Sequence, residues 1–313
     1  MCGFLCIIRK EKVNKTPKNN SIPENLLYHR GPDFTYEVQY ENIQVRHWRL
    51  SIVDLSDASN QPINDKKYIF VYNGEIYDYK KIVNHLGLDV NSDTWAVRSL
   101  LDSSDGLNKL YSLPGFFSYL LISKEEKTVL GSRDIFGKKP LYYFIDDNLA
   151  IFSSEEKAIL PFISSRNINQ ESLKEYFLYK DVFFGKSFYK GINEIPPGSN
   201  FLFDEKKWAM TISKSWDNYY DCDFSENFPN SYKEQNAEER KNNWLKKEIN
   251  NAVARRLTSD VPVQIGLSGG LDSTLITALA ADSNFSHVIN RAINVSFTQG
   301  VDESEDAKTT SKS

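Results

Sequence analysis

A cysteine stands at position 2, directly after the initiator methionine. Methionine aminopeptidases remove Met1 when the next side chain is small, which would leave Cys2 with a thiol and a free α-amine on one residue. An α-amine has an ordinary pKa of about 7.7–8.0, so near neutral pH it can accept the thiol proton and activate the sulfur as a nucleophile. Such chemistry needs no histidine. The alternative is that Cys2 is a small packing residue at the start of a strand.

A glycine-rich segment, Leu-Ser-Gly-Gly-Leu-Asp-Ser, occupies positions 267–273. It lies between the apolar run 261–267, which predicts a buried parallel strand, and a predicted helix over 274–281. A glycine-rich turn at a helix N-terminus offers backbone N–H groups and the positive end of the helix dipole, which together bind phosphate. The segment lacks the Gly-Lys-Ser/Thr of a Walker A loop. The alternative is a strand–helix turn that binds no ligand.

The elements that must position these residues follow from the alternation of short apolar runs and turn signals over the first 200 or so residues. Many short strands with few helices predict stacked sheets with helical layers. Asn73-Gly74 favours a tight turn directly after a strand. The pattern predicts strands at 2–8, 43–53 and 68–72, hairpins at 116–122 with 127–132 and at 141–144 with 149–153, and helices at 92–101 and 172–179.

The last third of the chain has a different pattern. Residues 217–243 are polar and poor in aliphatic side chains, which indicates a linker. A helix is predicted from about 237 to 257. The strand at 261–267, the helix at 274–281 and a second buried strand at 288–297 then form one β-α-β unit.

Composition narrows the class of protein. The 313 residues carry 38 Lys+Arg against 42 Asp+Glu, a net charge of -4, so nothing suggests nucleic-acid binding. No apolar run approaches the ~20 residues that span a bilayer. The N-terminus lacks the basic region and cleavage site of a signal peptide. Three cysteines make no disulfide framework. We therefore expect a cytoplasmic protein without a membrane partner.

Ordered motifs in the first 203 residues resemble one family. They are HRGPD at 29–33, RLSIVD at 49–54, NGEIY at 73–77, SDT at 92–94, RDIFGKKPLY at 133–142 and FSSE at 152–155. Together they resemble the class II glutamine amidotransferase domain, an N-terminal-nucleophile hydrolase. The particular residues of the motifs are similar to those of the asparagine synthetase branch. The glycine-rich loop at 267–273 is similar to the pyrophosphate loop of enzymes that split ATP into AMP and pyrophosphate.

The resemblance implies an α+β fold. An N-terminal-nucleophile hydrolase αββα sandwich would be followed by the start of a Rossmann-like α/β ATP-pyrophosphatase domain. The expected boundaries are an amidotransferase domain at 2–205, a connection at 206–236 and a partial synthetase domain at 237–313.

The resemblance also implies roles in the first domain. Cys2 would attack the side-chain amide carbon of glutamine and form a thioester. The Asn73 side chain and the Gly74 backbone N–H would stabilise the oxyanion, and glycine would let the backbone approach the substrate closely. Arg49 would hold the α-carboxylate and Glu75 and Asp93 the α-ammonium. The implied glutamine-binding set is Arg49, Ile52, Val53, Glu75 and Asp93.

Other residues of these motifs are expected to be structural. Arg30 and the Arg133-Asp134 pair would form ion pairs that shape the site and the domain interface. Cys6 and Cys222 match no functional position of the family, and we expect them to be packing residues. No set of protein metal ligands is predicted.

In the second domain, the resemblance implies an ATP site. Ser268, Gly269, Gly270 and Ser273 would hold the pyrophosphate end of ATP, and Asp272 would help to place Mg²⁺ or the loop. Leu267 and Val295 would touch the adenosine. The implied set is Leu267, Ser268, Gly269, Gly270, Asp272, Ser273 and Val295.

The implied activity is glutamine-dependent asparagine synthesis, with glutamine, aspartate and ATP·Mg²⁺ as small-molecule partners and a homodimer as the assembly. Synthetase domains of the family continue well beyond position 313, so we expect a fragment or truncated chain that is competent for glutaminase chemistry at most. Two alternatives remain. The same plan could amidate another carboxylate, on a sugar or a peptide, or the chain could be a catalytically silent regulatory or partner subunit.

Overall fold

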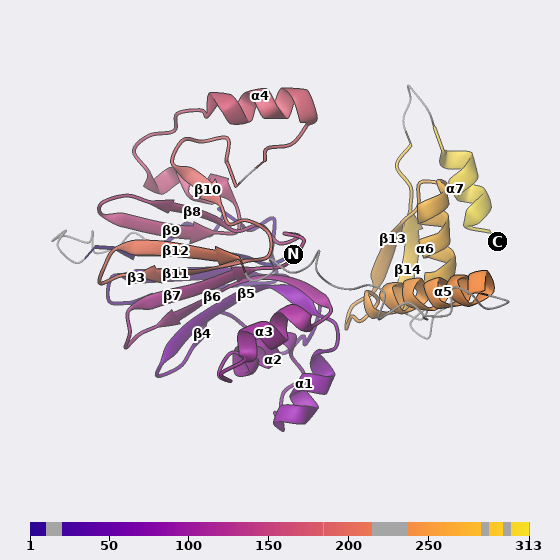
Figure 1. Ribbon diagram of the computed structural model, residues 1–313, viewed down its shortest axis with the longest axis horizontal. Coiled ribbons are helices and arrows are strands. Elements are labelled where there is room, and N and C mark those ends of the chain that lie inside the picture. The colour runs from indigo at the N-terminus through magenta and orange to yellow at the C-terminus, as the bar shows by residue number, and fades with distance from the viewer. Residues whose placement is uncertain (11–20, 184, 215–236, 283–287, 297–301, 313) are drawn as a thin grey trace. The chain divides into compact units, whose positions relative to one another are not determined.

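The computed structural model describes residues 1–10, 21–183, 185–214, 237–282, 288–296 and 302–312 (Figure 1). The chain divides into two compact units. The first comprises Met1–Ser51 and Leu55–Asp217, and the second comprises Ile52–Asp54 and Asn218–Ser313. Each unit is described by itself.

The first unit contains two six-stranded sheets in which every pair of neighbouring strands is antiparallel. Sheet A has the order β10-β8-β9-β1-β3-β2, and sheet B has the order β12-β11-β7-β6-β5-β4. Sheet A consists of β1 (Gly3–Arg9), β2 (Phe34–Tyr40), β3 (Ile43–Arg49), β8 (Tyr142–Ile145), β9 (Leu149–Ser153) and β10 (Ile192–Glu194). Sheet B consists of β4 (Ile63–Asn64), β5 (Tyr68–Ile76), β6 (Gly115–Ser123), β7 (Thr128–Arg133), β11 (Ser199–Asp204) and β12 (Ala209–Lys214).

The main core lies between the two sheets, because alternate residues of each strand face the same side. From β1 it contains Phe4, Cys6 and Ile8, and from β5 it contains Ile69 and Val71, all fully buried. The intervening residues of β1 belong to a second core on the outer face of sheet A, with Leu5, Ile7, Trp48, Ala158 and Ile159 among its members. The side chains of β1 are therefore buried on both faces of the sheet.

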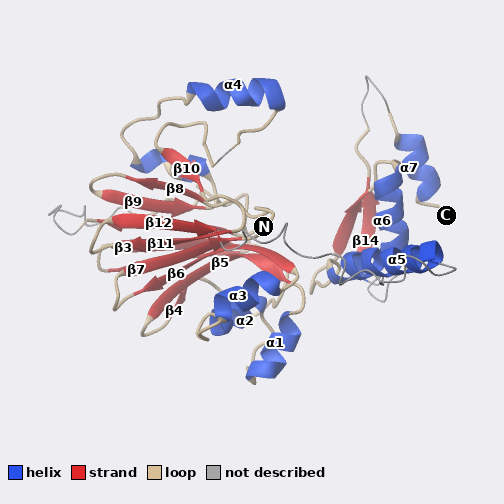
Figure 2. Cartoon of the chain, in the orientation of Figure 1, coloured by secondary structure: helices blue, strands red, loops and turns tan. Residues whose placement is uncertain are grey.

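Helices flank the sheets on both sides (Figure 2). On the side of sheet B lie α1 (Tyr79–Leu86), α2 (Asp93–Leu100) and α3 (Gly106–Ser112), and α2 contacts β5. On the side of β8 and β10 lies α4 (Gln170–Tyr179). Short 3₁₀ helices occur at Asp57–Ser59, Glu156–Ala158 and Leu160–Phe162. This arrangement confirms the predicted αββα sandwich.

The second unit contains the predicted β-α-β unit. Its elements are α5 (Ala237–Arg255), β13 (Val263–Gly266), α6 (Leu271–Ala281), β14 (Ile289–Ile293) and α7 (Ser304–Thr310), and β13 pairs in parallel with β14. The prediction of buried strands was wrong for this chain, since β13 is at most half-buried and most of β14 is exposed. Within the described residues only these two strands form the sheet, so strands that would flank and cover them are not among those residues.

Three further sequence predictions differ from the structure. Asn73-Gly74 is not a turn, because β5 continues through both residues to Ile76. The strand predicted at 43–53 ends at Arg49. The connection predicted at 206–236 begins too early, since β12 pairs with β11 and extends the first unit past residue 205, while residues 215–236 lie outside the described residues.

No helix in the described part of the chain is long and apolar enough to cross a membrane.

Candidate active site

Cys2 precedes β1 in the row of alternate residues that faces the space between the sheets. It is partly exposed, at the end of the buried row formed by Phe4, Cys6 and Ile8. The Leu50 N–H donates to the Cys2 Sγ at 3.4 Å, and the thiol lies 3.6 Å from the Leu50 carbonyl oxygen. The end of β1 thus places a thiol where the inter-sheet core meets solvent.

Arg30 holds the backbone of this cysteine. Its Nε donates to the Cys2 carbonyl oxygen at 2.9 Å, and its Nη1 pairs with Glu155 Oε1 at 3.0 Å. Arg30 is buried, so its ion pair with Glu155 and its hydrogen bond to Cys2 hold Cys2 within the fold. This is the structural ion pair that the sequence predicted for Arg30.

Burial raises the pKa of the Cys2 thiol, and the Leu50 N–H counteracts part of this rise. The thiol is therefore protonated at neutral pH and is a weak nucleophile until a base removes its proton. The structure retains Met1, and the charge of the Met1 α-amine lowers the pKa of this thiol. The arrangement fits a nucleophile that depends on the N-terminal amine.

Strand β5 contributes Asn73 and Glu75 to the same face as its core residues Ile69 and Val71. The Asn73 side chain is 1% exposed, and neither its amide nitrogen nor its amide oxygen has a hydrogen-bond partner among the described residues. A buried amide left without partners costs about 1–3 kcal/mol, so such a group calls for an explanation. A ligand oxygen that accepts from this amide would supply one.

Packing against the neighbouring strand requires a glycine at position 74, in addition to the predicted approach of a substrate. A Cβ at this position would lie 2.3 Å from the Phe116 carbonyl oxygen and 2.8 Å from the Phe117 Cα of β6. Glycine therefore lets β5 and β6 approach closely next to Asn73.

Two carboxylates meet at the end of β5. Asp93, the first residue of α2, is 5% exposed and accepts from Tyr72 Oη at 3.3 Å and from the Ile76 N–H at 3.4 Å. Burial, followed by the charge of Glu75, raises the pKa of Asp93 to about 7. Burial also raises the pKa of Glu75, and Lys139 opposes this. Two carboxylates that destabilise each other's charge form a favourable place for a cation such as an ammonium group.

The other residues predicted to bind glutamine are Arg49, Ile52 and Val53. Arg49 is buried at the end of β3, and its Nη1 donates to the Ser56 carbonyl oxygen at 2.8 Å and to Asn60 Oδ1 at 2.6 Å. Ile52 and Val53 belong to the segment that groups with the second unit, so their position relative to Cys2 is not described. The structure brings Cys2, Glu75 and Asp93 into one electrostatic cluster with Lys139.

The Arg133-Asp134 pair shapes the loop that carries Lys139. Arg133 forms the predicted kind of ion pair, at 2.9 Å from Glu194, and also donates to the Lys139 carbonyl oxygen at 3.0 Å. Asp134 acts instead as an acceptor for backbone N–H groups of the residues Phe117, Phe136, Lys138 and Lys139. Sequence reasoning missed Lys139, which is 6% exposed; its signal was the fixed loop of the RDIFGKKPLY motif.

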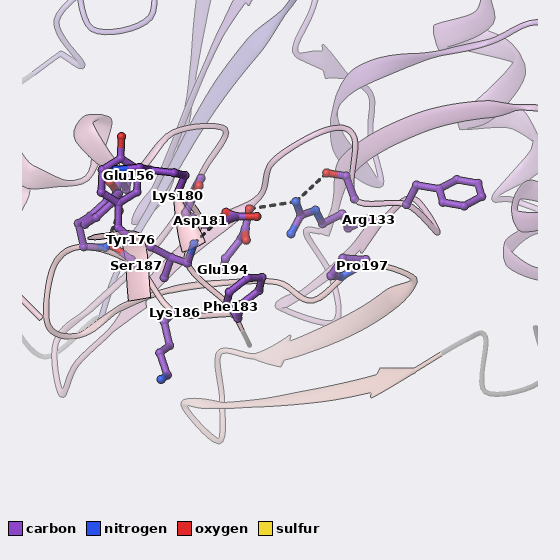
Figure 3. A pocket seen from close by; sticks show the side chains of 16 residues that line it. Arg133, Glu156, Tyr176, Lys180, Asp181, Phe183, Lys186, Ser187, Glu194 and Pro197 are labelled. Atoms are coloured by element: carbon purple, nitrogen blue, oxygen red, sulfur yellow. Dashed lines mark hydrogen bonds and ion pairs between the residues drawn. The ribbon is translucent and has the colours of Figure 1, made fainter. Parts of the chain in front are cut away.

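A separate cavity of about 490 Å³ lies between the end of α4 and the loops around β8 and β10, and Arg133 is one of the residues that line it (Figure 3). Its acidic lining residues are already engaged. Glu194 pairs with Arg133, and Glu156 accepts from the Ser187 hydroxyl and, at 3.3 Å, from the Phe188 N–H. Because these groups satisfy one another, the cluster around Cys2 is the better candidate for chemistry.

The second unit presents the glycine-rich loop between β13 and α6. Gly269 has φ +89, and a Cβ there would lie 2.9 Å from the Glu303 carbonyl oxygen. The hydroxyls of Ser268 and Ser273 are 3.0 Å apart, and Gly270 is the N-cap residue of α6, which begins at Leu271. The N–H groups of a first helical turn lack intrahelical partners, so with the two hydroxyls they fit a phosphate.

The remaining predicted residues of this site lie around the same end of the two strands. Asp272 is exposed in the first turn of α6. Leu267 is buried directly after β13, and Val295 is exposed just after β14. In the described part of the chain, no group of three His, Cys, Asp or Glu side chains could hold a metal ion.

Comparison with known proteins identifies the family. The sequence model of a family described as a glutamine amidotransferase domain matches residues 1–216. The chain belongs to this family. A second family model, described as asparagine synthase, matches residues 245–313, which contain the glycine-rich loop. The amidotransferase unit is therefore followed in the chain by a segment that matches the asparagine synthase family.

Individual relatives agree with this assignment. The chain is 32% identical over 310 residues to a protein of Methanocaldococcus jannaschii named putative asparagine synthetase [glutamine-hydrolyzing] 2, covering 89% of this chain and 56% of that protein. It is 30% identical over 324 residues to asparagine synthetase [glutamine-hydrolyzing] 1 of Bacillus subtilis, covering 99% and 48%. It is 28% identical over 299 residues to amidase chry2 of Gibberella zeae, covering 90% and 43%. The chain thus spans about half the length of the relatives it matches.

Proposed function

We propose that the first unit of this amidotransferase hydrolyses glutamine to glutamate and ammonia, with Cys2 as the N-terminal nucleophile. The α-amine of Cys2 accepts the thiol proton, and the sulfur attacks the side-chain amide carbon. The carbon–nitrogen bond breaks, the proton passes to the leaving nitrogen, and ammonia departs from a thioester. Water then adds to the thioester carbon, and glutamate leaves the sulfur, which recovers its proton.

The observation that carries the proposal is the buried, unpartnered amide of Asn73 on the strand face that points toward the Cys2 end of the inter-sheet space. An amide N–H held in place before the substrate arrives can stabilise the oxyanion of each tetrahedral intermediate. The Gly74 N–H is the proposed second donor. The desolvated position strengthens both interactions relative to water.

Recognition of glutamine is proposed to rest on charge. Glu75 and Asp93 would accept from the α-ammonium, and their mutual repulsion would be relieved when that cation binds. Arg49 would hold the α-carboxylate, with Ile52 and Val53 as further contacts. The hydrogen bonds of Arg49 to Ser56 and Asn60 orient its guanidinium.

For the second unit we propose binding of ATP. Ser268, Gly269, Gly270 and Ser273 would hold the pyrophosphate end, and Leu267 and Val295 would touch the adenosine. The Asp272 carboxylate would contribute one ligand to Mg²⁺, which binds proteins through few carboxylates and takes other ligands from phosphates and water. The two hydroxyls and the free N–H groups of α6 support this assignment.

In the whole protein, ammonia would react with a carboxylate that ATP has activated, with release of AMP and pyrophosphate. Aspartate is the first candidate acceptor, which would make asparagine, because the relatives from Methanocaldococcus jannaschii and Bacillus subtilis carry that name. A second candidate is another carboxylate, and the similarity to a protein named an amidase favours keeping it.

The test of the glutaminase proposal compares the chain with its Cys2→Ala variant in glutamate and ammonia release from glutamine. Alanine also permits removal of Met1, so the α-amine is kept while the sulfur is lost. We expect the rate to fall by about three orders of magnitude or more. Cys6→Ala is the matched control, because Cys6 is a buried core residue, and it should hydrolyse glutamine like the unmodified chain. Retained hydrolysis by Cys2→Ala would contradict the mechanism.

A further inference from the structure

Lys139 is a buried cation at the end of the inter-sheet space. Its ammonium lies 4.4 Å from the centroid of the Phe116 ring, and the next residue is tied to the sheet because the Ser118 hydroxyl donates to the Pro140 carbonyl oxygen at 3.4 Å. In the β5–β6 register Phe116 pairs with Glu75 and Ser118 pairs with Asn73. Lys139 therefore lies over the β6 residue opposite Glu75, and Pro140 contacts the β6 residue opposite Asn73.

The backbone of Lys139 is held on both sides. Its N–H donates to Asp134 Oδ2 at 3.0 Å, and its carbonyl oxygen accepts from Arg133 Nε at 3.0 Å. Taking an ammonium group out of water costs several kcal/mol unless nearby charges compensate. A loop with this many fixed contacts therefore holds a costly charge at one place, beside the carboxylate of Glu75.

The charged and titratable groups around Lys139 come from four segments. They are Glu75 of β5, Cys2 before β1, Arg30 in the loop before β2 and Asp134 in its own loop. The structure retains Met1, and the charges of Cys2, Lys139, Arg30 and Glu75 act on the Met1 α-amine. Removal of Met1 moves the α-amine by one residue, onto Cys2, where we expect the same groups to act on it. The charge of Lys139 also acts on the Cys2 thiol and on Glu75, a proposed substrate-binding carboxylate.

We propose that Lys139 is a positioning residue of the glutaminase site, whose positive charge, held over the Phe116 ring opposite Glu75, acts on the N-terminal nucleophile and on the carboxylate proposed to bind the ammonium of the substrate. The inference rests on the proposed glutaminase function. It assigns to the second lysine of the RDIFGKKPLY motif an electrostatic task rather than a packing role.

The positive charge of Lys139 lowers the pKa values of three groups: the α-amine, the Cys2 thiol and the Glu75 carboxyl. Burial lowers the pKa of the Met1 α-amine most, and the charges of Lys139 and Arg30 lower it further. We expect the same direction for the α-amine of Cys2 after removal of Met1. Burial raises the pKa values of the Cys2 thiol and of Glu75, and Lys139 opposes both rises. Loss of the Lys139 charge would raise all three pKa values. Because each group acts in its deprotonated form, the enzyme would then need a higher pH to become active.

The experiment measures kcat/KM for glutamine against pH in the 313-residue chain and in Lys139→Met. We expect the acid limb of the profile to move to higher pH by about one unit, the size expected for one partly buried charge several ångströms away. Lys139→Arg keeps the charge and should return the limb to its original position. Lys139→Gln is a second neutral variant in case the methionine variant does not fold.

Lys138→Met is the matched control. Lys138 is the adjacent lysine of the same motif, but it is exposed and lies 6.0 Å from the Phe116 ring. Its removal should leave the profile unchanged. A profile of Lys139→Met or Lys139→Gln that superimposes on that of the unmodified chain would overturn the proposal, and so would an equal shift in Lys138→Met.

A second measurement does not depend on turnover. The rate of Cys2 alkylation by iodoacetamide is followed against pH by mass spectrometry of the N-terminal peptide, which also contains the buried Cys6. The pH of half-maximal labelling should rise in Lys139→Met and return in Lys139→Arg. If the unmodified chain hydrolyses no glutamine, the proposed glutaminase function fails, whereas an unchanged labelling profile in Lys139→Met refutes the role of Lys139.

Discussion

At the scale of the residue, the candidate site is a set of charges whose protonation depends on burial. Asp93 is the clearest case, since burial and the neighbouring Glu75 raise its pKa to about 7 from the ordinary 3.8. Between these two values the folded chain binds a proton that the unfolded chain does not. The stabilisation from this proton is present below about pH 4 and is lost as pH rises through about 7.

The first prediction at this scale concerns Asp93→Asn. At pH 8 the variant should be more stable than the unmodified chain by about 4 kcal/mol, because it removes a buried charge while the asparagine oxygen still accepts from Tyr72 and Ile76. The difference should vanish near pH 4. Urea unfolding at a series of pH values measures it.

Asp89→Asn is the control for this prediction, since Asp89 is an exposed aspartate that precedes the same helix. It should leave the pH dependence of stability unchanged. Equal stability of Asp93→Asn and the unmodified chain at both pH 8 and pH 4 would refute the raised pKa.

At the scale of the element, β5 shows where sequence reasoning worked and where it failed. The apolar run at 68–72 predicted the start of this strand. The Asn73-Gly74 dipeptide suggested a turn, because the local preference of these residues does not show that β6 lies alongside them. The packing requirement for glycine at position 74 can be recognised only when the position of β6 is known.

Gly74→Ala tests this packing. The added Cβ would lie 2.3 Å from the Phe116 carbonyl oxygen, so β5 or β6 must move. We expect a loss of stability of about 3 kcal/mol, typical of an overpacked site, measured by thermal or urea unfolding. Gly266→Ala is the matched control in strand β13, where a Cβ would meet nothing within 4 Å. A Gly74→Ala variant as stable as the unmodified chain would show that this contact is not rigid.

The candidate site could be predicted only in part, because the sequence motifs do not show which side chains the neighbouring elements bury. The motifs predicted Cys2, Asn73, Glu75 and Asp93, and the structure shows the physical setting of each. Lys139 could not be predicted as buried, because one of two consecutive lysines in a loop is ordinarily exposed. Only the contacts of Arg133 and Asp134 with its backbone reveal that this side chain is held at the sheet edge.

At the scale of the whole molecule, the chain joins an amidotransferase unit to a segment that matches the asparagine synthase family, and it spans about half the length of the relatives it matches. The first unit has two sheets and a core that is buried on both faces of β1. In the second unit β13 and β14 are largely exposed. We therefore expect chemistry in this chain to depend on the first unit.

The central claim, that mature Cys2 is the nucleophile for glutamine, is tested most directly by intact-mass spectrometry of the 313-residue chain after incubation with a diazoketone analogue of glutamine. The account predicts a mass without Met1 and with one adduct, which peptide mapping places on Cys2 and which excess glutamine prevents. A retained Met1, or labelling that spares Cys2, would contradict it.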